Sequence, residues 1–321
     1  MIPSLSEQST YTMLPSGSWL TQTWRLTGWT LWLSRRRLMS KILAIILLVG
    51  WLAVIGILLL ALLTVSNAGS QGEPGAAGVD QQVAQLLTFP DNIPVIAGYT
   101  TYIGTILLCI LAGALSGDEY SFGTQRLMLS RGVSRAQLIV SQVWALALLA
   151  LILSGAMILL GIISGLTIGP LVGGVILSPT LAGVGPLLLV WLALALHLLA
   201  YALIALFLGT LGRSTAAGIA GSLGYIIFEA IALPILIGLA LFLGGTTKAV
   251  LLFVYHALLG PNLAAVLTGT EGVLLNVDTS AGASTGPFTI SPAQGLLISL
   301  LYCAVFSGLS YWIVRQRDVT H

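Results

Sequence analysis

The sequence predicts an all-α polytopic membrane protein with six transmembrane helices, and three observations lead to this fold class. First, 57% of the 321 residues are hydrophobic and 7% are charged, whereas a soluble domain carries about 25% charged residues because its surface faces water. Second, the apolar residues gather in runs long enough to span a bilayer. Third, the basic residues gather between alternate runs. Most of the protein surface is therefore expected to face lipid.

The spans follow from the length of these runs, because a helix needs about 20 apolar residues to cross about 30 Å of hydrocarbon. Six segments meet this requirement and make up one transmembrane domain over residues 42–314. Gly113-x-x-x-Gly117 and Gly161-x-x-x-Gly165 lie in or beside them, and we interpret these glycines as positions of close helix packing. The predicted spans are 42–65, 95–116, 138–166, 186–211, 215–243 and 294–314.

The orientation follows from the basic residues, since lysine and arginine concentrate on the cytoplasmic side of membrane proteins. We expect a cytoplasmic N-terminal segment at 1–41 and a cytoplasmic tail at 315–321. With six spans between them, eleven of the twelve lysines and arginines share one side, and only Lys248 lies on the other. The sequence therefore predicts a multi-pass protein of the cell (cytoplasmic) membrane with both termini in the cytoplasm.

The segment 19–33 holds half of the eight tryptophans and is followed by Arg35-Arg36-Arg37. Tryptophan rings favour the headgroup level of a bilayer. Arginines near that surface attract anionic lipids, each contributing on the order of 1 kcal/mol. We interpret this segment as an interfacial helix on the inner leaflet. The alternative is a loose tail whose arginines merely follow the positive-inside rule.

The apolar segment 249–267 is broken by Gly260-Pro261. If it were a seventh span, Arg315 and Arg317 would move to the outer side, against the distribution of the other basic residues. We therefore expect an outer re-entrant helical segment between spans five and six. Such backbone is tolerated at membrane depth where it packs against protein.

The cytoplasmic loop at 117–137 reads G-D-E-Y-S-F-G-T-Q-R-L-M-L-S-R-G-V-S-R-A-Q. Apolar side chains are interleaved with arginines, and the acidic pair Asp118-Glu119 suits the positive end of a helix dipole. A bland loop does not need apolar side chains among its charges, whereas a short helix that docks on a partner needs both. The alternative is that these residues only cap helix ends and follow the positive-inside rule.

Ten residues of this loop and of the next span recur in a family pattern: Glu119, Gly123, Thr124, Arg126, Leu127, Leu129, Val133, Ser134, Arg135 and Leu138. The pattern resembles the E-x-x-x-G-T-x-R-x-L-L…(P/G)-V-S-R signature of ABC-2 type transporter permeases, including the multicopper-enzyme-maturation group and many drug or peptide exporters. The resemblance extends to the plan of an interfacial helix, six spans and an outer re-entrant segment. Family members often carry a lysine shortly after the S-R pair, where this sequence has Ser141-Gln142.

The resemblance implies a permease subunit that exports a small or amphipathic substrate and is coupled through this loop to a separate ABC ATPase. ATP and Mg would bind to that partner, so this chain would be neither an enzyme nor a cofactor-binding protein. A second permease subunit, identical or related, and the lipid bilayer would be the other partners, with no role for nucleic acid. The residues it implies for ATPase coupling are Glu119, Gly123, Thr124, Arg126, Arg131, Ser134 and Arg135.

Two ionisable residues, His197 and Glu229, lie inside predicted spans, where an unpaired charge costs several kcal/mol or more. Both lie roughly 22–24 Å from the inner turn between spans four and five, at a rise of about 1.5 Å per residue. They are therefore at a similar depth on antiparallel neighbours. We expect either a pair or two polar groups that line a shared cavity. The alternative is that each is neutral and bonded to a backbone carbonyl.

Several kinds of chemistry are missing from the sequence. The chain contains no G-x-x-x-x-G-K-[ST] and no H-E-x-x-H, so it carries neither a P-loop nor that zinc-protease motif. No metal site is predicted, and Cys109 and Cys303 are interpreted as small buried hydrophobes. Two other functions stay open: a membrane-embedded enzyme that uses His197 and Glu229, and a non-transporting membrane anchor or assembly factor.

Overall fold

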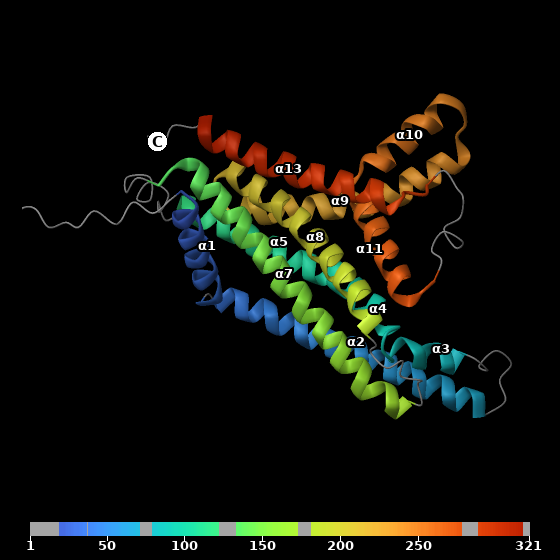
Figure 1. Ribbon diagram of the computed structural model, residues 1–321. Helices are drawn as coiled ribbons and strands as arrows, with labels where there is room; N and C mark the ends of the chain where they lie inside the picture. The colour runs from blue at the N-terminus through green and yellow to red at the C-terminus, as the bar shows by residue number, and fades with distance from the viewer. Residues whose placement is uncertain are drawn as a thin grey trace, which may run out of the picture.

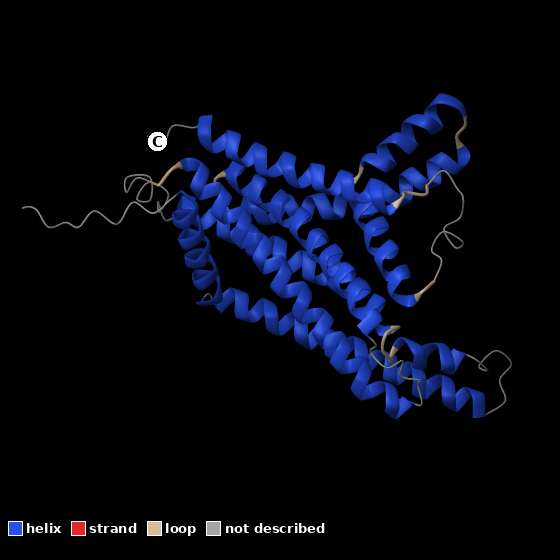
Figure 2. Cartoon of the chain, viewed as in Figure 1, coloured by secondary structure: helices blue, strands red, loops and turns tan. Residues whose placement is uncertain are grey.

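The computed structural model describes residues 19–36, 38–70, 79–121, 133–172, 181–277 and 288–316. These residues form helices and short turns, and none of them lies in a strand (Figure 1, Figure 2). Two short elements depart from α geometry, since η1 is a π-helical turn and η2 a 3-10 turn. The elements are α1 (Trp19–Arg36), α2 (Leu38–Ser70), α3 (Val79–Leu86), α4 (Asn92–Tyr99), η1 (Thr100–Gly104), α5 (Thr105–Ser121), α7 (Arg135–Ile168), η2 (Gly169–Val172), α8 (Leu181–Gly212), α9 (Thr215–Phe242), α10 (Gly245–Ala257), α11 (Leu259–Leu275) and α13 (Pro292–Gln316).

The predicted fold class is confirmed at the level of helix content and candidate spans. Within the described ranges, six helical stretches are long and apolar enough to cross a membrane. The pair α10–α11 passes the same test only when taken together, and it is bent by 65° at the break between its helices. The six stretches are Leu38–Asn67, Asn92–Gly117, Arg135–Val172, Gly183–Gly212, Thr215–Phe242 and Pro292–Gln316.

The start of α8 differs from the prediction, which placed the beginning of the fourth span at Pro186. The helix begins at Leu181 and continues through Pro186, and α9 likewise continues through Pro234. Proline lacks a backbone N–H and therefore tends to end helices in water. Transmembrane helices tolerate it because neighbouring groups satisfy the freed carbonyl. Proline is thus a weak marker of helix ends in this chain.

Helix α8 occupies the centre of the bundle and packs against α5, α7, α9, α11 and α13. Its buried leucines Leu198, Leu203 and Leu206 form the main core together with α5. Helices α2, α9 and α13 are mostly exposed, and their outer faces carry leucine, isoleucine and phenylalanine. A water-soluble protein would not present such faces, so the exposure pattern agrees with a lipid environment.

Glycines bring α5 and α9 into close contact. A methyl group at Gly113 would lie 2.7 Å from the backbone nitrogen of Ile219, and one at Gly117 would overlap the backbone of Thr215. Gly218 faces Gly113 from the other helix. A Cβ added at Gly218 would lie 2.8 Å from the Cα of Gly113. The interpretation of Gly113 and Gly117 as packing residues is therefore confirmed.

The two ends of the bundle carry different elements (Figure 1). One end holds α1, the start of α7, the C-terminal end of α13 and the tight turn between α8 and α9. In this turn Arg213 has a φ of 50° and Ser214 caps α9. The opposite end holds α3 and the α10–α11 pair. Apart from Lys248 and from Lys41 in the first turn of α2, the described basic residues belong to the elements at the first end.

Candidate functional site

A cavity of about 510 Å³ lies among η1, α5, α8, α9, α10 and α11, beside the break between α10 and α11. Much of its lining is apolar, from isoleucine, leucine, alanine and proline. The π-helical turn η1 interrupts the second span at this point, and π-helical turns often occur at functional sites. The polar lining residues that bear on the argument are Thr101, Tyr102, Thr105, His197, Tyr201 and Glu229.

Glu229 is buried, with 3% of its surface exposed, and both of its carboxylate oxygens accept hydrogen bonds. The hydroxyl of Tyr201 donates to Oε2 at 2.6 Å, and the backbone N–H of Gly260 donates to Oε1 at 2.6 Å. Gly260 lies in the first turn of α11, whose own N-cap residue, Leu258, makes no side-chain cap. Glu229 therefore caps α11 from a neighbouring helix, where a negative charge is favoured by the helix dipole.

The backbone carbonyls at the α10–α11 break also accept hydrogen bonds from side chains. The Asn262 amide donates to the carbonyls of His256 and Leu258 at 2.7 and 2.6 Å. From α13, the Tyr302 hydroxyl donates to the carbonyl of Ala257 at 2.9 Å. Backbone groups freed at the end of a helix are costly in an apolar environment unless they find partners. Side chains of α9, α11 and α13 thus hold this bend.

His197 and Glu229 line the same cavity, and Tyr201 contacts both. The rings of His197 and Tyr201 lie 5.2 Å apart between centroids, and the Tyr201 hydroxyl bonds to Glu229. Among the described residues, no ion pair joins His197 to Glu229. Sequence reasoning did not single out Tyr201, although it lies four residues after His197 and so on the same helix face.

Two buried polar atoms at the cavity have no hydrogen-bond partner within the described part of the chain. They are Nδ1 of His197 and Oγ1 of Thr105, and Thr105 has 3% of its surface exposed. Buried polar atoms are nearly always bonded, so two orphans in one cavity require an explanation. Thr105 was also missed by sequence reasoning, because a threonine inside a span usually bonds to its own helix and gives no signal.

The predicted coupling segment is described only at its two edges. Glu119 lies in the last turn of α5, and Gly123, Thr124, Arg126 and Arg131 fall outside the described residues. Ser134 caps α7 in a reciprocal capping box with Gln137. Arg135 donates from one guanidinium nitrogen to the carbonyls of Val314 and Arg315, at 3.1 and 3.0 Å.

The α7 end of this segment is also bonded to α1. The Gln137 side chain donates to Oε1 of Gln22 at 3.1 Å, and the Thr27 hydroxyl lies 3.4 Å from the carbonyl of Ser141. The first turns of α7 are thus bonded to α1 on one side and to the last turn of α13 on the other.

Helix α1 turns its polar residues inward and its tryptophans outward. Thr23, Thr27 and Ser34 are buried against the bundle. The exposed rings make contacts among themselves and with a cation: Trp29 stacks on Trp32 at 5.0 Å, and the Arg36 guanidinium lies 4.1 Å from the Trp32 ring centroid. The predicted helix is present, and its outer face has the composition of a membrane–water interface.

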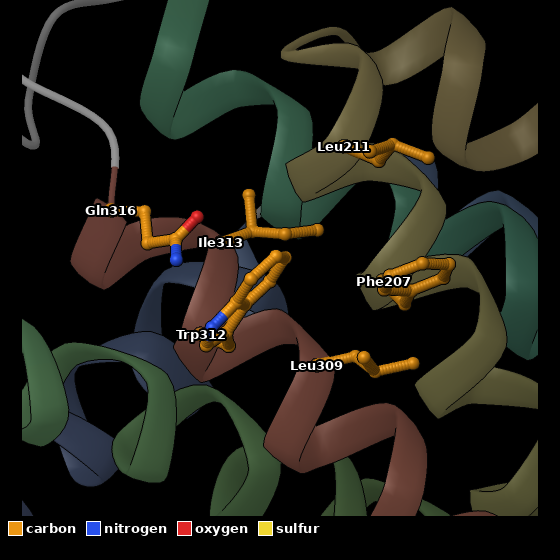
Figure 3. Close-up of a pocket in the computed structure, with 6 residues that line it drawn as sticks. All are labelled: Phe207, Leu211, Leu309, Trp312, Ile313 and Gln316. Atoms are coloured by element: carbon orange, nitrogen blue, oxygen red, sulfur yellow. The ribbon is translucent and has the colours of Figure 1, made fainter.

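A second cavity, of about 310 Å³, lies between α8 and α13 near the end that holds α1. Leu309 and Ile313 of α13 face Phe207 and Leu211 of α8 across it (Figure 3). Among the six labelled lining residues, the polar atoms come from the Trp312 indole and the Gln316 amide. This cavity offers apolar packing and no acid–base group.

No group of three or more His, Cys, Asp or Glu that could hold a metal occurs within the described ranges.

Comparison with known proteins adds a family but no activity. No curated protein matches the chain. The model of one family, described as "Protein of unknown function (DUF2705)", matches residues 79–320, which is more than half of the chain. The match runs from α3 to the end of the described residues and includes every element that lines the larger cavity. The chain therefore belongs to the DUF2705 family.

Proposed function

We propose that this chain is the permease subunit of an ATP-driven ABC-2 type transporter, exporting a small or amphipathic substrate across the cytoplasmic membrane. The observation that carries the proposal is a set of hydrogen bonds at the first turn of α7. Arg135 bonds there to α13, and Gln137 bonds to α1. This turn directly follows the loop whose residues resemble the family's coupling signature. A partner that displaced this loop would move three helices together.

The orientation in the membrane is part of the proposal. The end that holds α1, the α8–α9 turn and the C-terminal end of α13 would face the cytoplasm, because the basic residues gather there. Helix α1 would lie in the inner headgroup layer with its tryptophans toward lipid. The α10–α11 pair would be a re-entrant segment on the outer side. Its 65° bend and its side-chain-bonded break support this over a straight seventh span.

The ATPase would dock on the loop at 117–137, and the cycle of ATP binding and hydrolysis would then move α5 and α7 as levers. Those helices pack against α8, which lines the larger cavity, so their motion would change that cavity. A second permease subunit, identical or related, would complete the pathway. The exposed apolar face of α9, with Ile227, Phe228 and Ile231, offers either a lipid contact or an interface for it.

Co-purification with an ABC ATPase encoded in the same operon would test this function. The tagged chain should capture that ATPase in mild detergent, and Glu119→Ala with Arg126→Ala should reduce capture strongly. A matched control, Lys248→Ala with Glu271→Ala, removes one charge of each sign at the opposite end and should capture normally. Size-exclusion profiles would establish that all three proteins remain folded. Absence of capture by the unaltered chain would contradict the proposal.

One observation favours a second candidate, a membrane-embedded enzyme: His197, Tyr201 and Glu229 gather at one cavity. Acid–base catalysis needs such groups within reach of a substrate. The described lining offers no serine or cysteine as a nucleophile, which weakens this candidate. Turnover of a substrate by the purified chain without any ATPase, lost in His197→Gln, would favour the enzyme over the transporter.

A further inference from the structure

We propose that the cavity among η1, α5, α8, α9, α10 and α11 binds a lipophilic cation, with the Glu229 carboxylate as its counter-charge. The inference deepens the proposed transport function and rests on it, because it names the class of substrate that this permease would carry. It is carried by three features of the cavity: its acidic side chain, its unbonded polar atoms and the character of its walls.

The cavity holds one acidic side chain, that of Glu229, and no lysine or arginine among its described lining residues. Both Glu229 oxygens accept short hydrogen bonds, from Tyr201 and from the backbone of Gly260 at the start of a helix. Donors on both oxygens and a helix N-terminus favour the ionised carboxylate, whereas burial away from water opposes it, so a cation bound beside Glu229 would stabilise the ionised form. These donors supply only partial positive charge, so a full positive charge on a ligand would complete the pairing.

The unbonded atoms indicate that the ligand also carries a polar group. His197 and Thr105 line the cavity, and each carries one buried polar atom, Nδ1 and Oγ1 respectively, that has no partner in the described part of the protein. Leaving a buried polar atom unbonded costs free energy, which a ligand that bonds to it recovers. An amine or ammonium group with adjacent hydrogen-bonding atoms would meet both needs.

The walls of the cavity suit an apolar ligand of drug-like size. Its volume of about 510 Å³ lies within the range of about 300–1,000 Å³ that is common for small-molecule sites. Three tyrosines, Tyr102, Tyr201 and Tyr255, line it together with aliphatic side chains, and aromatic faces attract cations. Tyr102 is 76% exposed, so the lining reaches the outer surface of the bundle. A ligand dissolved in the membrane could enter past it.

A comparison of two ions of matched size and shape tests the sign of charge without altering the protein. Tetraphenylphosphonium and tetraphenylborate would be titrated against the purified chain in zwitterionic nanodiscs, with empty nanodiscs subtracted. We expect saturable binding of the phosphonium and at least about tenfold weaker binding of the borate. Equal or tighter binding of the borate would overturn the inference, as would the absence of saturable phosphonium binding.

Variants then assign the effect to Glu229. Glu229→Gln keeps an acceptor for Gly260 but removes the charge, and should weaken phosphonium binding by about tenfold. Glu271→Gln, an acid on α11 that does not line the cavity, should leave binding unchanged. Should Glu229→Gln not fold, Tyr102→Ala tests the same cavity at an exposed position and should weaken binding several-fold. Unchanged binding in the folded variants would contradict the assignment.

These measurements use the chain without an ATPase, so they separate the two proposals. Phosphonium binding in a chain that captures no ATPase would leave the cavity assignment standing and remove the transporter. ATPase capture by a chain that prefers the borate would remove the cavity assignment alone.

Discussion

The carboxylate of Glu229, in the middle of α9, bonds to the backbone N–H of Gly260 in the first turn of α11 at 2.6 Å. This bond joins two segments that lie 31 residues apart in the chain and fixes the start of a helix that has no cap of its own. It also accounts for the glycine. A Cβ at Gly260 would lie 3.0 Å from Cδ of Glu229 and 3.1 Å from Oε1.

Gly260→Ala should therefore destabilise the protein. The added methyl group would push the Glu229 carboxylate away from the start of α11, and such overpacking typically costs about 1–3 kcal/mol. Thermal unfolding in detergent would measure the change. Gly238→Ala is the matched control, because a Cβ there meets no atom within 4 Å. Equal melting temperatures for the two variants would contradict the tight approach of Glu229 to α11.

Tyr201→Phe should remove the second donor to Glu229 while keeping the ring. We expect a loss of about 1–3 kcal/mol, since the hydrogen bond is to a buried acid. A double-mutant cycle with Glu229→Gln should show that the two changes are not additive, because they break the same bond. The same cycle run with His197→Gln in place of Tyr201→Phe should show weaker coupling. Additive effects of Tyr201→Phe and Glu229→Gln would argue that the bond is absent in the membrane.

Asn262→Leu should open the break between α10 and α11. The change removes the amide that bonds to the carbonyls of His256 and Leu258, and leaves two acceptors unbonded in an apolar environment. The expected cost is about 1–3 kcal/mol for each buried acceptor that finds no other partner. Limited proteolysis near Leu258 should become faster. Thr268→Val is the control, because that hydroxyl bonds only to carbonyls of its own helix. Proteolysis at the unaltered rate in Asn262→Leu would contradict this role.

Arg135→Gln should loosen the C-terminal turn of α13. The guanidinium of Arg135 bonds to the carbonyls of Val314 and Arg315, and a cation near the last turn of a helix is stabilising. Hydrogen exchange in the last turn of α13 should accelerate several-fold. Arg25→Gln, at an exposed position of α1, should not change it. Unaltered exchange in Arg135→Gln would show that α7 and α13 are not held together by this residue.

The tryptophans of α1 give a direct measure of its place in a bilayer. In a variant whose only tryptophan is Trp29, brominated lipids should quench the fluorescence most when the bromine lies near the headgroup. A variant that keeps only Trp51, which is buried between helices, should be quenched much less. Strong aqueous quenching of Trp29 by iodide, with little effect of brominated lipids, would contradict an interfacial α1.

The sequence by itself determined the six long apolar helices, the tight turn after Gly212, the helix at the N-terminal tryptophans and the packing glycines of α5. Each of these depends on local composition, because run length, breakers and small residues act on neighbouring positions along one chain. It also identified His197 and Glu229 as polar residues at a similar depth. The break in the segment 249–267 was predicted at Gly260-Pro261, whereas the structure places it at Leu258, between the end of α10 and the start of α11.

Only the tertiary structure decided what those residues contact. Periodicity does not tell which face of α9 meets α11, so the capping of that helix by Glu229 could not be read from the sequence. Tyr201 and Thr105 gain their roles from neighbours brought close by the packing of α8 and α5. The path of α8 through Pro186 was likewise decided by its surroundings, since local propensity alone favours a helix start there. Helices form from nearby residues, whereas a cavity forms where several helices fail to fill the space between them, and that depends on every contact at once.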